Sequence, residues 1–301
     1  MSELTWGIIL AAYLFLGGLA GGAYIVGALA DLFKKEKYKV LSKSAVLASL
    51  LCIIFGLVLL VLDLKRFEVA PLVILNAYRR LPASIMTVGT WIITMFTLVS
   101  LVTVVLLYLD GWSLVRKIVE IVGVILGLAT AAYTGILLSF ARGVPFWHSG
   151  FLPWLFVLSG VLTGLAIAIV MVPVAAVFMP KAFGDFKEMW ETTESFAGLI
   201  EFTDKYAQII ILLETAVMIL YFVTTPTTSI LWSGSNVSLY FYAYLLLALV
   251  IPGTISYYNM KLVDAGRHKM LIWMTIVASV LALVGGFLLR YVVLIGGQLI
   301  F

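Results

Sequence analysis

Charged residues are scarce in this chain, and several long stretches contain almost none. Lys, Arg, Asp and Glu make up 11% of the 301 residues, whereas a soluble domain carries about 25%. Residues 81–109 have no charge, residues 206–260 have only Glu214, and residues 270–301 have only Arg290. Each run exceeds the roughly 20 apolar residues that cross a bilayer as a helix. The scarcity of charge excludes a soluble protein and predicts an integral membrane protein.

Cysteine and histidine are equally scarce. The single cysteine, Cys52, excludes a disulfide or an iron–sulfur cluster held by this chain alone. The two histidines, His148 and His268, fall in loops that the topology below places on opposite faces, so they cannot ligate one haem b. The net charge of +4 is modest and follows from the asymmetry of the loops. We therefore expect no haem, no metal site and no nucleic-acid binding.

Eight apolar segments of spanning length predict an all-α membrane protein with a single domain over residues 1–301. Pro173 is expected to kink the fifth span. The acidic stretch before the sixth span, which includes Asp204, is expected to be a solvated amphipathic segment, with a binding surface as the alternative. The predicted spans are 5–30, 44–62, 83–109, 117–141, 152–179, 205–223, 238–260 and 270–296.

Basic residues predict the orientation of these spans, because Lys and Arg are enriched in cytoplasmic loops. Thirteen of the 19 basic residues lie in the loops after spans one, three, five and seven. The sequence therefore places these loops in the cytoplasm and both termini outside, in a prokaryotic inner membrane. The thirteen are Lys34, Lys35, Lys37, Lys39, Lys43, Arg116, Lys117, Lys181, Lys187, Lys205, Lys261, Arg267 and Lys269.

Two tyrosines lie within spans at positions that favour contact with the interior of the bundle. Gly17 and Gly21 are four residues apart, a spacing that lets helices approach closely in lipid. Tyr13 shares their helix face and is expected to point into the bundle, unless it is an interfacial tyrosine. Tyr133 lies in the outer half of span four, where its hydroxyl needs a partner. That partner is either a neighbouring helix or a ligand.

Three charged residues lie within spans or at their ends. Asp63 ends span two and either pairs with Lys65 and Arg66 or serves a site. Arg290 in span eight should face a cavity or a carboxylate, and Asp63 is an available partner. Glu214 lies near the middle of span six. It either belongs to a proton or ion path or is a protonated carboxyl bonded to a serine or threonine.

The topology places Tyr13, Asp63, Tyr133 and Arg290 toward the outer face, although they are far apart in the sequence. Their convergence predicts a polar pocket in an apolar wall, which suits an amphiphile with a polar head and an apolar tail. Quinones fit this description, because their carbonyl oxygens accept hydrogen bonds from tyrosine hydroxyls and carboxylates can take up their protons.

Five short motifs occur in a fixed order along the chain. They are Tyr13-Leu-Phe-Leu-Gly-Gly-Leu-Ala-Gly-Gly22, Leu62-Asp63-Leu64 with Arg66, Pro82-Ala-Ser-Ile-Met-Thr-Val-Gly-Thr-Trp91, Tyr133-Thr-Gly-Ile-Leu-Leu-Ser139 followed by Pro145-Phe-Trp147, and Gly285-Gly286 through Arg290 to Gln298. Together they resemble the membrane subunits of the polysulfide reductase family, also called the NrfD/PsrC family.

This resemblance implies two four-helix bundles, at about 5–141 and 152–296, and a quinone site near the outer face. It implies Tyr13 and Tyr133 as quinone ligands, with Gly17 on the same face. It also implies an iron–sulfur (ferredoxin-like) partner subunit, which contacts a molybdopterin catalytic subunit. Family members without haem are the rule. The tyrosine at position 13, where a histidine also occurs in the family, changes the proton chemistry available there.

We therefore expect a quinone-reactive membrane anchor of a respiratory oxidoreductase of the polysulfide, thiosulfate or sulfoxide reductase type, which is not active alone. Tyr13 and Tyr133 would hydrogen-bond menaquinol, Asp63 would accept a proton, and Arg290 would favour the charged form of Asp63. Glu214 would belong to a proton path. Electrons would leave through another polypeptide, because the chain has no redox metal of its own.

The outer loops 65–82 and 142–151 are expected to dock the iron–sulfur subunit, and dimerisation of the complex is left open. Two alternatives stay open as well. One is a secondary transporter with its substrate near Glu214, which should show broken helices or paired repeats. The other is a structural anchor whose pocket holds a lipid. The expected docking residues are Arg66, Arg79, Arg80, Trp147 and His148.

Overall fold

The structure, a computed structural model, describes residues 7–34, 38–63, 78, 84–109, 112–141, 143–178, 193–263 and 268–299. These residues form helices and connecting turns. The first four long helices are α1 (Ile8–Lys34), α2 (Lys39–Asp63), α4 (Ile85–Tyr108) and α5 (Ser113–Ser139). They are followed by α6 (Leu152–Phe178), α8 (Thr193–Thr224), η1 (Pro226–Trp232), α9 (Asn236–Tyr244), η2 (Leu245–Val250), α10 (Ile251–Val263) and α11 (His268–Gln298).

Eight helical segments are long and apolar enough to cross a membrane, with α9, η2 and α10 forming one of them. The eight predicted spans are therefore confirmed. Two of them begin at least five residues earlier in the chain than predicted. Because α2 begins at Lys39, Lys43 lies within a helix and is buried, although the sequence suggested a loop. Because α8 begins at Thr193, the predicted acidic loop segment around Asp204 is also helical.

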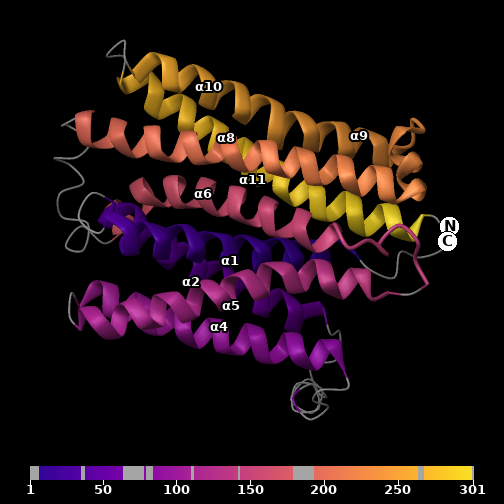
Figure 1. Ribbon diagram of the computed structural model, residues 1–301, viewed down its shortest axis with the longest axis horizontal. Coiled ribbons are helices and arrows are strands. Elements are labelled where there is room, and N and C mark those ends of the chain that lie inside the picture. The colour runs from indigo at the N-terminus through magenta and orange to yellow at the C-terminus, as the bar shows by residue number, and fades with distance from the viewer. Residues whose placement is uncertain are drawn as a thin grey trace.

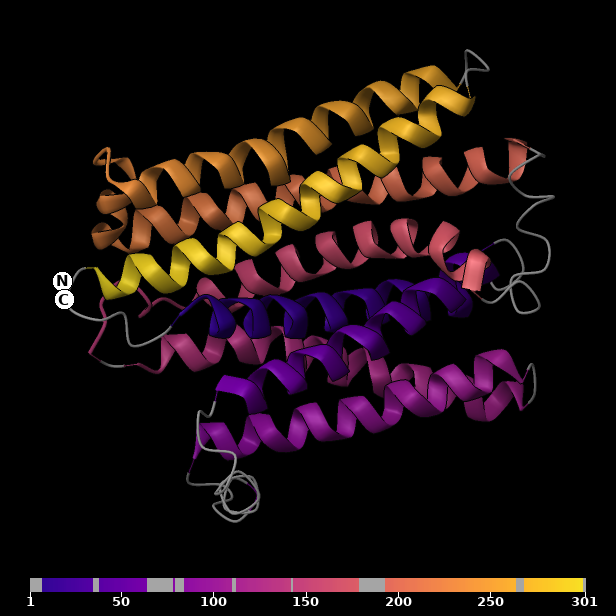
Figure 2. The same cartoon turned by 180° about the vertical axis from the view of Figure 1, so that it is seen from behind.

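The helices run side by side along the long axis of the molecule (Figure 1). Helices α1 and α6 lie in the middle, with α2, α4 and α5 on one side and α8, α10 and α11 on the other, as the view from behind also shows (Figure 2). Helix α1 begins and α11 ends at the same end of the molecule, which we call the N-terminal end. The opposite end is called the far end. The division into two bundles and the side of the membrane that each end faces stay predictions.

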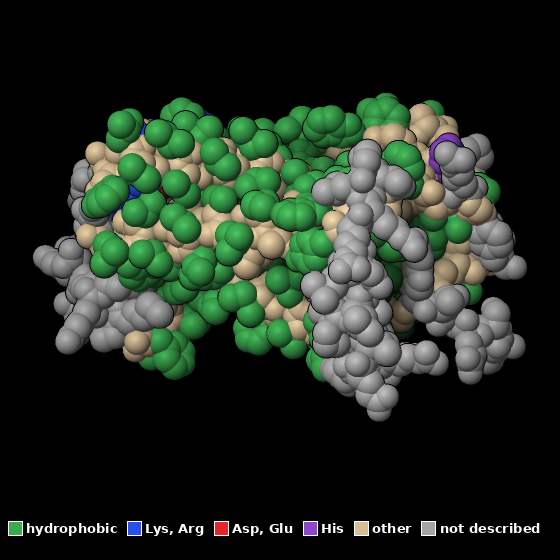
Figure 3. Space-filling view, turned by 90° about the horizontal axis from the view of Figure 1, so that it is seen from below, with side chains coloured by type: hydrophobic (Ala, Val, Ile, Leu, Met, Phe, Trp, Pro, Cys, Tyr) green, Lys and Arg blue, Asp and Glu red, His purple; other side chains and the backbone are tan. Residues whose placement is uncertain are grey.

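The outer surface of the helices is apolar. Figure 3 shows that hydrophobic side chains cover most of the described surface on the α4 side. Leu98 and Leu101 of α4 and Ile121 and Ile125 of α5 are among the large exposed side chains. Such a surface is unfavourable in water but suits contact with lipid tails. Polar groups of the spans are therefore to be sought between the helices.

Glycines let α1 pack against two helices at once. A Cβ atom on Gly22 would collide with the backbone of Gly160 of α6, and one on Gly164 with the backbone of Gly22. On the neighbouring face of α1, a Cβ on Gly21 would collide with the carbonyl of Gly127 of α5. The small residues at four-residue spacing therefore do what the sequence predicted, since they bring helix backbones into contact.

The seventh span changes its helical geometry at its middle. Helix α9 ends at Tyr244, and η2 is a wide π-type segment that precedes Pro252 of α10. Proline has no N–H group to continue a regular ladder of hydrogen bonds. Gly285 of α11 allows close approach, because a Cβ there would meet the backbone of Ala248 within η2. Such π segments often occur at functional sites, and this one directly follows Tyr244.

Candidate functional site

Tyr13 of α1 and Tyr133 of α5 lie together between the helices. Their side chains are 5% and 7% exposed, respectively. The two phenol groups are close enough to interact electrostatically. Tyr13 lies on the same helix face as Gly17, which packs against Thr134 of α5. The structure thus brings together two of the four groups that the sequence predicted to converge.

Glycines on two further helices make room for these rings. Gly89 of α4 packs so closely against the Tyr133 ring that a Cβ atom there would overlap it. Gly56 of α2 lies beside Tyr13, with its would-be Cβ 3.8 Å from Cδ2 of the ring. The tyrosine pair is therefore enclosed by α1, α2, α4 and α5. Its hydroxyl groups can donate or accept hydrogen bonds in an apolar surrounding.

Arg290 of α11 lies in a second polar cluster and is fully buried. Its guanidinium donates hydrogen bonds to the Ser159 hydroxyl and the Phe156 carbonyl of α6, and to the Gly286 carbonyl of its own helix. The Phe156 ring lies 5.1 Å from the guanidinium carbon. A charged side chain in a span needs such partners, because water is absent there.

Glu214 of α8 belongs to the same cluster. Its Oε1 atom accepts a hydrogen bond of 2.8 Å from the hydroxyl of Tyr244, and both side chains are fully buried. The carboxylate also interacts electrostatically with Arg290 and lies near Ser159. The sequence treated Glu214 and Arg290 as separate sites, whereas the structure joins them through residues of four helices.

The two clusters lie on neighbouring faces of α1. Gly17 faces α5 and the tyrosine pair, whereas Gly18 faces Arg290, whose Nη2 atom is 2.9 Å from a would-be Cβ on that glycine. The carboxylate found near Arg290 is that of Glu214. Asp63 is the last residue of α2, at the N-terminal end, and its side chain lies outside the described residues. The predicted pairing of Asp63 with Arg290 thus stays a prediction.

The predicted docking residues are placed only in part. Arg66, Arg79 and Arg80 lie outside the described residues. Trp147 is only 3% exposed, and its indole N–H donates to the Val293 carbonyl at 2.7 Å. Its side chain therefore fixes the loop to α11 and is not free to touch a partner. His148 is exposed on the same loop, so a docking role for it stays a prediction.

A charged cluster that the sequence did not reveal lies between α1 and α5 near the far end. Arg116 contacts Asp31, with 3.2 Å between Nε and Oδ2, and Glu120, with 3.8 Å between Nε and Oε1. All three are buried. Two turns earlier in α1, Tyr24 forms a 2.6 Å hydrogen bond with Thr103 of α4. Glu120 lies inside the span predicted over 117–141, and this was the signal that could have revealed the cluster.

Asp204 is a second residue whose position the sequence did not predict correctly. It was expected on a solvated segment, but it is 4% exposed. Its carboxylate accepts a 2.9 Å hydrogen bond from the amide of Asn259 of α10. The prediction was wrong because α8 begins well before Asp204 and carries this side chain between α10 and α11.

These features define a class: a multi-pass membrane protein with eight apolar helices whose polar side chains are turned inward. The chain matches the family described as polysulphide reductase, NrfD, over residues 1–301, and it therefore belongs to that family. The predicted resemblance is confirmed, and so is the assignment to a prokaryotic inner membrane as a multi-pass protein.

Two relatives show which proteins the chain is similar to. It is 29% identical to the C subunit of polysulfide reductase from Wolinella succinogenes over 191 residues, or 55% of this chain and 57% of that protein. It is 24% identical to the Hdr-like menaquinol oxidoreductase integral membrane subunit of Archaeoglobus fulgidus over 240 residues, or 77% of this chain and 59% of that protein. The matches thus span less than two thirds of these curated relatives.

Proposed function

We propose that this chain is the quinol-oxidising membrane subunit of a multi-subunit respiratory oxidoreductase. The observation that carries the proposal is the buried pair of Tyr13 and Tyr133, enclosed by glycines on α2 and α4. Membership of the NrfD family and similarity to a protein named as a menaquinol oxidoreductase subunit support it. We infer that the ligand is menaquinol.

The chemistry of the tyrosine pair fits the polar head of a quinol. Menaquinol, when bound, supplies two electrons and two protons. The Tyr13 and Tyr133 hydroxyls can each donate to or accept from a head-group oxygen and so orient the ring. Gly56 and Gly89 leave the space that the two tyrosine rings occupy, so that both rings can lie between the helices. Asp63, the last residue of α2, would take up a proton from the hydroxyl that Tyr13 orients.

Electrons would pass to an iron–sulfur subunit docked at the N-terminal end, and from there to a molybdopterin enzyme. The exposed His148 would contribute to that docking surface, with Trp147 holding the loop in place. The basic residues Arg66, Arg79 and Arg80 would add positive charge to it. This arrangement would place the quinol site and the partner on the same side of the membrane.

Glu214 would exchange protons in support of this reaction, rather than bind a transported substrate. A transporter site is expected between broken helices near mid-membrane. Helix α6 continues through Pro173, and the seventh span stays one continuous helical segment through its π-type stretch and Pro252. The third alternative, an anchor whose pocket holds only a lipid, differs from our proposal in one measurable property, since it predicts no bound quinone.

The test is menaquinol oxidation by the purified complex, with quinone extracted from the same preparation. Tyr133→Phe and Tyr13→Phe should each raise KM roughly tenfold, because each loses one hydrogen bond to the head group. Tyr206→Phe is the matched control, because Tyr206 is exposed on α8. The complex that carries this variant should oxidise quinol normally. Unchanged kinetics in the double variant of Tyr13 and Tyr133 would contradict the proposal.

A further inference from the structure

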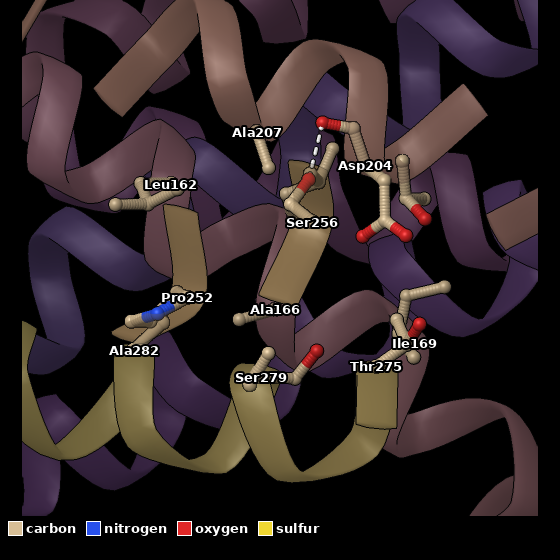
Figure 4. A pocket seen from close by; sticks show the side chains of 13 residues that line it. Leu162, Ala166, Ile169, Asp204, Ala207, Pro252, Ser256, Thr275, Ser279 and Ala282 are labelled. Atoms are coloured by element: carbon tan, nitrogen blue, oxygen red, sulfur yellow. Dashed lines mark hydrogen bonds between the residues drawn. The ribbon is translucent and has the colours of Figure 1, made fainter. Parts of the chain in front are cut away.

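A small chamber lies between α6, α8, α10 and α11, and its polar groups gather on one side. Its volume is about 30 Å³, which exceeds the roughly 10–15 Å³ that one water molecule needs. Figure 4 shows Asp204 and Thr275 toward one side of it and Leu162 and Pro252 toward the other. The chamber therefore has room for a small ion beside oxygen atoms.

Asn259 of α10 holds the Asp204 carboxylate of α8 beside the Thr275 hydroxyl of α11. Its Nδ2 atom donates to Asp204 Oδ2 and to Thr275 Oγ1, each at 2.9 Å. The two oxygen atoms cannot be farther apart than the sum of these distances, so both are within reach of one ion. The Ser256 hydroxyl also lies near the carboxylate, and it donates to the Asp204 backbone carbonyl at 2.7 Å.

Ser279 supplies a further hydroxyl to the chamber. Its side chain is 7% exposed, and it lines the chamber one turn along α11 from Thr275, on the same helix face. Its hydroxyl makes no hydrogen bond within the described part of the chain. A buried polar group without a partner is unfavourable. A ligand that binds the Ser279 oxygen would therefore be stabilised in this chamber.

The charge of Asp204 needs a counterion. The residue is 4% exposed and lies within the apolar segment Gly198–Thr224. Among the described residues, no Lys or Arg side chain forms an ion pair with it. A buried carboxylate inside a membrane is costly without a partner of opposite charge. A cation in the chamber would supply that partner.

We propose that the chamber binds a single Na⁺ ion, held by the Asp204 carboxylate and the hydroxyl oxygens of Thr275 and Ser279. Hard cations prefer oxygen ligands, whereas transition metals favour His and Cys, which the described lining residues do not include. One carboxylate balances one positive charge, so a divalent ion would leave a net charge in apolar surroundings. The small chamber favours Na⁺ over the larger K⁺. The ion ties α8 to α11, independently of the quinol site.

The test measures binding of radiolabelled Na⁺ to the purified complex in a choline buffer. The wild type should bind a single ion per chain that Asp204→Asn loses, and unlabelled Na⁺ should displace this ion more readily than K⁺. Thr275→Val and Ser279→Ala each remove one oxygen ligand and should weaken binding roughly tenfold. The matched controls Glu201→Gln and Thr254→Val change exposed residues of α8 and α10 and should bind as the wild type does.

Thermal unfolding separates loss of the ion from damage to the fold. Na⁺ in place of choline should raise the Tm of the wild type and of both controls, and should leave the Tm of Asp204→Asn unchanged. Equal Na⁺ binding by the wild type and Asp204→Asn overturns the proposal, as does wild-type affinity in both Thr275→Val and Ser279→Ala. A wild-type Tm that is the same in Na⁺ and choline also overturns it, and would indicate a protonated Asp204 beside water only.

Discussion

Arg290 illustrates how a single charged side chain is kept inside a membrane protein. Its hydrogen bonds go to a serine hydroxyl and two backbone carbonyls, and Glu214 lies near enough for electrostatic attraction. None of these partners is close to Arg290 in sequence apart from Gly286. The need for a partner could therefore be predicted from the sequence, but the identity of the partner depends on helix packing.

Removing the Arg290 charge should destabilise the protein, because Glu214 would lose the nearby cation. We expect Arg290→Met to lower the free energy of unfolding by roughly 1.5–3 kcal/mol, the range for hydrogen bonds to a charged group, because the Ser159 hydroxyl and the carbonyls of Phe156 and Gly286 also lose their donor. The double variant of Arg290→Met and Glu214→Gln should recover part of this loss. Thermal unfolding of the purified protein measures both. An equal loss in the single and double variants would show that the two charges are not coupled.

The Tyr244 hydroxyl should contribute to stability through its hydrogen bond to Glu214. Tyr244→Phe removes a donor from a buried carboxylate, a change that costs roughly 1.5–3 kcal/mol. Tyr242→Phe is the control, because Tyr242 is on the same helix but 41% exposed. Thermal unfolding should separate the two variants, and identical stability for both would contradict this assignment.

At the scale of single helices, the sequence was informative about spans and weaker about their ends. Apolar length alone located all eight spans, and the four-residue spacing placed Tyr13 and Gly17 on a face toward the interior of the bundle, where the structure has them. The start of α8 was missed because its first turns are rich in acidic residues. Asp204 was therefore assigned to solvent, although tertiary packing buries it.

The contact of α1 with α6 should depend on the absence of side chains on both helices. Gly22→Ala puts a methyl group against the backbone at Gly160, so the helices must separate, at a cost of roughly 1–3 kcal/mol. Gly253→Ala is the control, because its added methyl group would meet only the Ile211 side chain at 3.7 Å. Folded yield and thermal stability of the two variants in membranes should differ accordingly.

At the scale of the whole molecule, two polar regions lie on adjacent faces of one central helix. The tyrosine pair lies among α1, α2, α4 and α5, whereas Glu214 and Arg290 lie among α6, α8, α9 and α11. Gly17 and Gly18 of α1 contact one region each. Helix α1 is therefore in direct contact with both regions. This relation could not be predicted from the sequence, because it depends on which helices are neighbours.

The orientation of the molecule predicts which cysteine variants react with a membrane-impermeant maleimide. His148→Cys at the N-terminal end should be labelled in intact cells. Trp112→Cys, which is exposed in the turn before α5 at the far end, should be labelled only after the membrane is opened. The native Cys52 lies within α2, and its variant Cys52→Ser supplies the background. The reverse labelling pattern would place the N-terminal end in the cytoplasm and would contradict the predicted topology.

The central claim, that a quinol binds at the tyrosine pair, is tested most directly by labelling the purified complex with a photoreactive menaquinone analogue. We predict that labelled peptides come from α1 and α5 around Tyr13 and Tyr133, and that excess menaquinone abolishes the labelling. Displaceable labelling confined to α8 and α11, or labelling that menaquinone does not displace, would contradict the account.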